Sequence, residues 1–194
     1  LEYQVGQITT GVAPGDQSLA QWINVLASNG TVVSEQKISD TSGGLIATLD
    51  DDDHFGRSVA DIGDLDGDGI NDIVVGARMD DDGGTDRGAV WVLFMDNDGT
   101  VKTLQKISST EGNFDGNLNS DDRFGSAVAG IGDINGDGVN DLAVGANQDD
   151  DGGSDRGAVW ILFMNTNGTV NSNQKISHNR GEFNGELHDG DRFG

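Results

Sequence analysis

Short runs of apolar, β-branched and aromatic residues recur along the chain, separated by turns rich in glycine and aspartate. Such runs predict β-strands, and the last run of each group alternates apolar and polar residues as an edge strand does. The turns "DGDG", "DDDGG" and "DNDG" punctuate them. No segment has the length and 3.6-residue period of a helix. An all-β chain is therefore predicted, with the first group of strands at 55–63, 71–77, 88–95 and 100–108.

The same order of strands and turns returns after 69 residues. "DRGAVWVLFM" at 86–95 recurs as "DRGAVWILFM" at 155–164, and the dipeptide "FG" stands at 55–56, 124–125 and 193–194. A fixed long period marks a solenoid, a propeller or a tandem array. Four strands in each period select the β-propeller, whose blades are four-stranded antiparallel sheets.

The period also sets the predicted blade boundaries. Residues 55–108 and 124–177 form two full blades, residues 1–39 hold a partial blade, and residues 193–194 begin the next blade. Propellers typically have four to eight blades, so the ring is incomplete within this sequence. We therefore expect these blades to sit beside further blades, from a longer chain or from a second copy in a homo-oligomer.

The charge balance restricts the partners. The chain has 34 acidic against 11 basic residues and a net charge of −23. So negative a field disfavours nucleic acid and anionic membrane surfaces, and it favours divalent cations. No apolar run reaches membrane-spanning length, so direct insertion into a membrane is not expected. The absence of cysteine excludes disulfides and thiol chemistry.

Two acidic loops, "DLDGDGIND" at 64–72 and "DINGDGVND" at 133–141, carry the candidate metal chemistry. Each offers side-chain oxygens at positions 1, 3, 5 and 9, a glycine at position 6 for a sharp turn, and a backbone carbonyl at position 7. Calcium takes six to eight such oxygens in irregular geometry. We predict two calcium ions per chain, one in each loop. The predicted ligands are Asp64, Asp66, Asp68, Ile70 and Asp72, then Asp133, Asn135, Asp137, Val139 and Asp141.

An EF-hand shares this oxygen spacing, but it needs a glutamate at position 12 and flanking helices. Position 12 is Val75 or Val144, inside a predicted strand, so an EF-hand is excluded. The segment "FGSAVAGIGDINGDGVNDLAVGA" at 124–146, followed by "RGAVWILF" at 156–163, resembles the FG-GAP repeat of integrin α-subunit propellers. The resemblance implies calcium loops between the first and second strands of a blade, on the face opposite the usual ligand surface. It also implies an extracellular setting.

The expected function is that of a calcium-stabilised, non-catalytic module at the cell surface or secreted from the cell, which binds an extracellular protein or glycan. The histidines do not recur at the 69-residue offset, and no catalytic residue is predicted. Two alternatives remain open: an accessory propeller domain of a secreted hydrolase or lyase, and a structural building block of a self-assembling surface array.

Two other sets of residues receive structural interpretations. The tryptophans Trp22, Trp91 and Trp160 stand at the same register within a strand, so they are expected to pack between blades. The clusters at 51–53, 80–82 and 149–151 are interpreted as solvated acidic turns, with weak additional cation sites or a cation-bridged partner surface as the alternatives.

Overall fold

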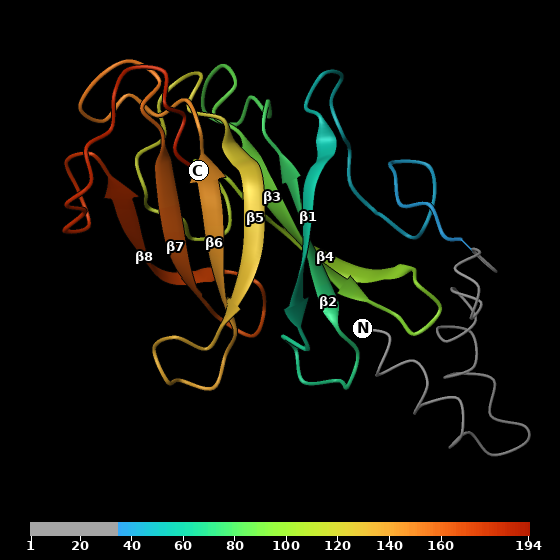
Figure 1. Cartoon of the computed structure of the whole chain (residues 1–194). Coiled ribbons are helices and arrows are strands. Elements are labelled where there is room, and N and C mark those ends of the chain that lie inside the picture. The colour runs from blue at the N-terminus through green and yellow to red at the C-terminus, as the bar shows by residue number, and fades with distance from the viewer. Residues whose placement is uncertain (1–34) are drawn as a thin grey trace, which may run out of the picture.

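The computed structural model describes residues 35–194, and the regular structure in that range is β-strand throughout (Figure 1). Eight strands form two antiparallel four-stranded sheets, in which strands that follow one another in the chain lie side by side. The predicted all-β class and the propeller-blade architecture are confirmed. The first sheet holds β1 (Phe55–Gly63), β2 (Asp72–Ala77), β3 (Ala89–Met95) and β4 (Val101–Ile107). The second holds β5 (Phe124–Gly132), β6 (Asp141–Ala146), β7 (Ala158–Met164) and β8 (Val170–Ser177).

The residue types along each strand match its place in the sheet. Strand β3 reads AVWVLFM, and all seven of its residues are buried, as expected for a strand covered on both faces. Strand β4 reads VKTLQKI and is buried only at its two ends. It lies at the outer edge of the sheet, where lysines discourage pairing with a foreign strand. Continuous hydrophobicity thus marks β3 as an inner strand of the blade, and alternating hydrophobicity marks β4 as its edge strand.

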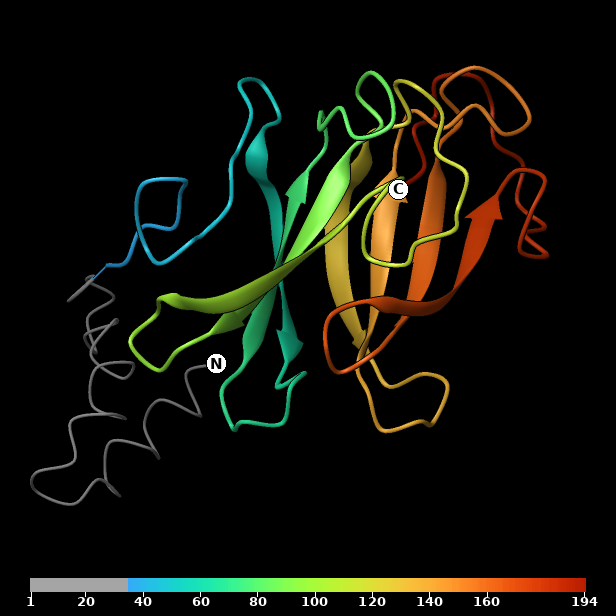
Figure 2. The ribbon, with the colours of Figure 1, turned by 180° about the vertical axis from the view of Figure 1, so that it is seen from behind.

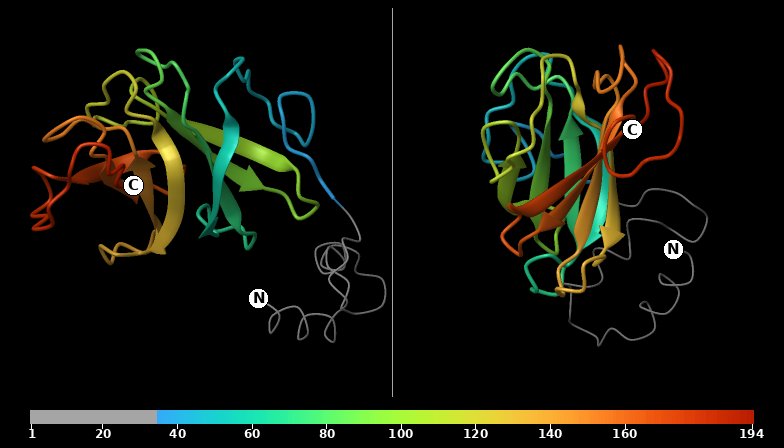
Figure 3. Two further views of the ribbon diagram at one scale, coloured as in Figure 1. Left: turned by 45° about the horizontal axis from the view of Figure 1, so that its top comes forward. Right: turned by 90° about the vertical axis from the view of Figure 1, so that its left-hand side faces the viewer.

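The two sheets pack face to face around one hydrophobic core. Strands β1 and β5 lie next to each other, and the sheets diverge from them toward β4 and β8 (Figures 1 and 3). Burying one valine or leucine side chain stabilises a fold by about 1.5–3 kcal/mol, so this contact is a major source of stability. The core side chains with no exposed surface include Val74, Val90 and Val92 of the first sheet and Leu142, Val144 and Leu162 of the second.

The segment between the blades fills the wedge where the sheets diverge (Figure 2). Its Phe114 and Leu118 are buried in the core that both sheets share. The Phe114 ring and the Trp160 indole lie nearly perpendicular to each other, with 5.1 Å between their centroids. Trp160 therefore packs between the blades, as predicted, while Trp22 lies outside the described residues.

A close backbone seam joins the first blade to the second, and its geometry recurs at the end of the chain. Gly88, just before β3, forms a parallel bridge with Phe124 at the start of β5, and Gly157 forms the same bridge with Phe193. The Ser58 hydroxyl donates a hydrogen bond to the Gly125 carbonyl oxygen at 2.9 Å. The "FG" dipeptide thus places the first residues of one blade against the third strand of the blade before it.

The far face of the second sheet is left partly open. The described residues include no third sheet, and apolar side chains on this face are only half-buried, whereas their counterparts in the first sheet are buried under the second. The half-buried residues are Val159, Ile161 and Phe163, and their buried counterparts are Val90, Val92 and Phe94.

Most of the partial blade predicted over residues 1–39 lies outside the described residues, which begin at residue 35. Within residues 35–194, no helix has the length and apolar character needed to cross a membrane.

Candidate metal sites

Both acidic loops lie at the same end of the molecule (Figure 1). One connects β1 to β2 and the other connects β5 to β6, so they occupy equivalent places on neighbouring blades. The side-chain amide of Asn140, in the second loop, donates a hydrogen bond to the Ile62 carbonyl oxygen at 2.8 Å. Ile62 lies two residues before Asp64, the first residue of the first loop. The bond therefore links the two loops across the blade boundary.

Asp64 organises the backbone of the first loop. One of its carboxylate oxygens accepts hydrogen bonds from the amides of Gly67 and Asp68, at 2.8 and 2.9 Å, and the other accepts from Gly69 at 2.9 Å. Gly67 and Gly69 have φ angles of 80° and 91°, which residues with a side chain adopt only at a cost. The glycines therefore allow the chain to wrap around a single carboxylate.

Asp72 anchors the other end of the loop. Its side chain is 1% exposed, and its two oxygens accept hydrogen bonds from the amides of Leu65 and Met95, at 2.9 and 3.0 Å. Burial raises the pKa of the Asp72 carboxyl above its ordinary value. Leu65 belongs to the loop and Met95 is the last residue of β3. Asp72 therefore closes the loop and also attaches it to β3.

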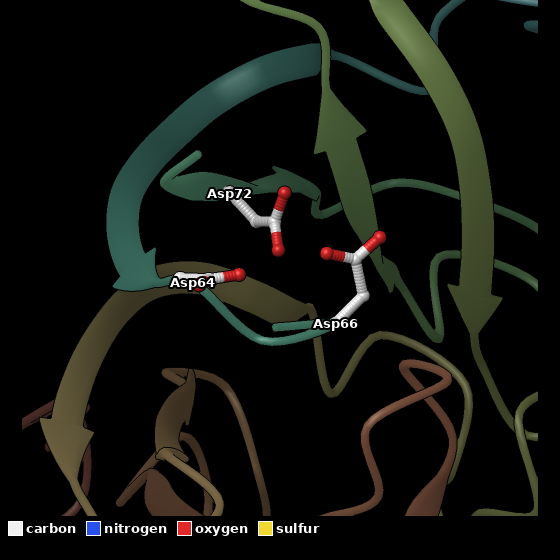
Figure 4. Close-up of side chains that lie close together, drawn as sticks. All are labelled: Asp64, Asp66 and Asp72. Carbon is white, nitrogen blue, oxygen red and sulfur yellow. The ribbon is translucent and has the colours of Figure 1, made fainter. Parts of the chain in front are cut away.

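The carboxylates of Asp64, Asp66 and Asp72 converge on one point (Figure 4). Each contributes an oxygen, and these oxygens lie within 4.8 Å of one another. Hard oxygen donors crowded in this way match the ligands that calcium prefers. The donor set of the first loop therefore fits a divalent cation.

The second loop repeats the backbone hydrogen bonds that the first and last aspartates of the first loop accept. Asp133 accepts hydrogen bonds from the amides of Gly136, Asp137 and Gly138, at 2.7, 3.1 and 2.8 Å. These bonds lower the pKa of the Asp133 carboxyl, and the bond from Gly138 contributes most. Asp141 accepts from the amides of Ile134 and Met164, both at 3.1 Å. The two loops are thus built alike.

The remaining predicted ligands lie in the same two loops. The Ile70 and Val139 amides donate to Asp68 and Asp137, each at 2.9 Å, while their side chains pack against the hydrophobic clusters. The Asn135 side-chain amide donates to Asp137 at 2.9 Å. The backbone carbonyls of Ile70 and Val139, and the side-chain oxygens of Asp68, Asn135 and Asp137, remain predicted ligands.

Comparison with known protein families matches the FG-GAP repeat to residues 55–93 and 124–162. Each match contains one acidic loop and the first three strands of a blade. The chain carries two FG-GAP repeats.

The chain is similar in sequence to integrin α-subunits. The chain is 41% identical over 115 residues to integrin alpha-PS2 of Drosophila melanogaster, which covers 57% of this chain and 8% of that protein. It is 41% identical over 115 residues to integrin alpha-6 of Homo sapiens and 40% identical over 119 residues to integrin alpha pat-2 of Caenorhabditis elegans. Each of these two alignments covers 59% of this chain and 9% of the relative. The chain thus spans less than a tenth of the length of these relatives.

The end of each blade opposite its acidic loop holds a buried ion-pair cluster, which differs from the solvated turns predicted there. Asp80 and Asp149 are 1% and 0% exposed. Lys106 lies 2.7 Å from Asp80, and Lys175 lies 2.6 Å from Asp149. The prediction was wrong for these two aspartates because a lysine on the outer strand folds over each of them. The recurrence of lysine at 106 and 175 in so acidic a chain was the available signal.

A second buried carboxylate stands beside each cluster. Burial raises the pKa of Asp122 to about 7, and the charge of Asp149 adds to this shift. Just before the first blade, Asp53 is buried rather than solvated as predicted, and burial and the charge of Asp80 raise its pKa to about 6. The folded chain holds these protons more tightly than the unfolded chain, so stability gained at low pH is lost as the pH rises through 6 and 7.

We expect Asp122→Asn to remove part of this pH dependence, because asparagine resembles the protonated carboxyl. Between pH 5.5 and pH 8 the wild-type free energy of unfolding should fall by about 1–2 kcal/mol more than that of the variant. Urea denaturation of the calcium-saturated chain at both pH values measures this. Asp121→Asn, which changes an exposed neighbour, serves as the control. Equal slopes for Asp122→Asn and wild type would contradict the prediction.

Proposed function

We propose that this chain is part of a calcium-stabilised, non-catalytic propeller module that recognises an extracellular protein or glycan. The observation that carries the proposal is the convergence of the Asp64, Asp66 and Asp72 carboxylates within an FG-GAP repeat. The similarity to integrin α-subunits supports an adhesion-type role at the cell surface or in a secreted protein.

Calcium would act as the counter-charge of each loop. Binding the ion relieves repulsion among carboxylates that the backbone has already drawn together. Two ions per chain are proposed. The ligands would be the side chains of Asp64, Asp66, Asp68 and Asp72 with the Ile70 carbonyl, and those of Asp133, Asn135, Asp137 and Asp141 with the Val139 carbonyl.

Further blades are the proposed neighbours of this segment. The half-buried face around Ile161 and Phe163 has the same residue types as the face of the first sheet that the second sheet covers. A third blade, from a longer chain or from a second copy, would bury it in the same way. We assign 55–108 and 124–177 to full blades, 1–39 to a partial blade and 193–194 to the start of the next.

Calcium titration tests the site assignment. Calorimetry on the chelator-treated chain should show about two sites, with dissociation constants on the order of 10⁻⁴ to 10⁻³ M or tighter. Asp68→Ala and Asp137→Ala should each remove one site, since each deletes a central carboxylate. The exposed Asp115, outside both loops, provides the control Asp115→Asn, which should keep both sites. The absence of calcium uptake by the wild-type chain would refute the assignment.

Recognition is tested separately. The chain, immobilised with calcium or with chelator, is exposed to arrays of glycans and of secreted and cell-surface proteins. A ligand bound in the calcium form supports the proposal, and no binding to either array in calcium contradicts it.

A further inference from the structure

A lysine reaches into the first acidic loop from the outer strand of the same blade. Lys102, at the start of β4, places its Nζ atom 2.8 Å from a carboxylate oxygen of Asp66 and 2.5 Å from one of Asp68. Both aspartates belong to the proposed ligand set. Two of the carboxylates that would bind the metal ion are therefore already paired with a cationic group of the protein itself.

The second blade has no such lysine. Strand pairing fixes the comparison, because Met95 pairs with Val101 in the first blade and Met164 pairs with Val170 in the second. The residues that follow, Lys102 and Asn171, hold equivalent positions. An uncharged amide thus stands in the second repeat where the first has an ammonium group.

The loops also differ in their acidic residues, and the two differences compensate. The first loop has four aspartates and the lysine, a formal charge of −4 + 1 = −3. The second has three aspartates with Asn135 in place of the fourth carboxylate, again −3. Lys102 therefore offsets the one carboxylate that the first loop has in excess.

We propose that Lys102 is a tethered cation that competes with calcium for the first loop, so that the two FG-GAP repeats bind calcium by different rules. This inference rests on the proposed calcium sites. In the metal-free chain the ammonium relieves repulsion between Asp66 and Asp68. When calcium enters, the same ammonium faces a divalent cation and must leave its partners. The first loop is then more stable without metal, and its affinity for metal is lower, than its four carboxylates alone would give.

The experiment measures each loop by itself. In the Asp137→Ala background, where only the first loop binds, Lys102→Asn should raise calcium affinity about 3- to 10-fold, as expected for loss of two exposed ion pairs. In the Asp68→Ala background, where only the second loop binds, the same change should leave the affinity unaltered. Isothermal titration calorimetry gives both constants.

Two control variants separate local competition from a change in net charge. Lys37→Asn removes the same charge from an exposed site outside both loops and should leave the first loop unchanged. Asn171→Lys, in the Asp68→Ala background, transfers the competitor to the second loop and should weaken calcium binding there. An equal gain from Lys37→Asn and Lys102→Asn would overturn the inference.

Melting temperatures supply a readout that an ordinary surface ion pair would not give. Lys102→Asn should lower the melting temperature in chelator and raise it at subsaturating calcium. A lowered value in both conditions, with unchanged first-loop affinity, would show that Lys102 is only a structural partner and overturn this inference while leaving the calcium sites intact. No calcium uptake by the wild-type chain would overturn both.

Discussion

Removal of calcium is expected to lower the melting temperature of the chain by about 10–20 °C. A ligand held at 100 times its dissociation constant stabilises the folded state by about 2.7 kcal/mol per site, and a chain of this length shifts by about 2–4 °C for each kcal/mol. The carboxylates of each loop are held together by backbone hydrogen bonds whether or not a cation is present. Without the ion their repulsion therefore acts directly against the folded blade.

Calorimetric melting in saturating calcium and in EGTA measures this effect. Magnesium should restore little of the lost stability, because it demands a more regular octahedral shell and gives up its water reluctantly. A double variant, Asp68→Ala with Asp137→Ala, provides the control and should melt at the same temperature in both solutions. If the wild-type chain also melts at one temperature, the loops are ordinary acidic turns.

The second large effect is expected at the seam between blades. Gly125 has φ 86°, and a Cβ atom at this position would overlap the Ala89 carbonyl oxygen of the preceding blade. Gly125→Ala should therefore reduce the free energy of unfolding by about 2–5 kcal/mol, combining left-handed strain with displacement of a packed backbone.

The chain offers a matched control for this substitution. Gly56 is the glycine of the first "FG" dipeptide and has φ 88°, but among the described residues nothing lies within 4 Å of a Cβ added there. Gly56→Ala should cost only the strain, about 1–2 kcal/mol. Urea denaturation of both variants gives the difference. Equal losses would show that the seam tolerates a methyl group.

The strands were predictable because their determinants are local. Hydrophobic runs and Asp-Gly turns placed the first four strands within one residue of their observed bounds, and the 69-residue period placed the next four. The spacing of oxygen donors was likewise the signal that the first loop gathers carboxylates. Asp64, Asp66 and Asp72 do converge.

The sequence did not predict that a loop aspartate would both face the candidate metal site and accept a hydrogen bond from a neighbouring strand. Asp72 holds the amide of Met95, a residue 23 positions away, and only the pairing of β2 with β3 brings the two together. The lysines Lys102 and Lys106 were missed for the same reason, since their partners lie on connections that precede them by one or two strands. Three consecutive aspartates at 80–82 also give no sequence signal for which one turns inward.

The seam has a consequence for how a gene encoding such blades can change length. The same 69-residue unit encodes both sides of the contact between blades. One side is the glycine just before the third strand of a blade, and the other is the phenylalanine that begins the first strand of the following blade. Unequal recombination that adds or deletes a whole unit would recreate the Gly88–Phe124 type of junction unchanged. An insertion of any other length between β4 and β5 would have to be accommodated beside Phe114 and Leu118, which that connecting segment carries into the core. Selection for a packed core would therefore favour growth and loss of this sequence in whole blades.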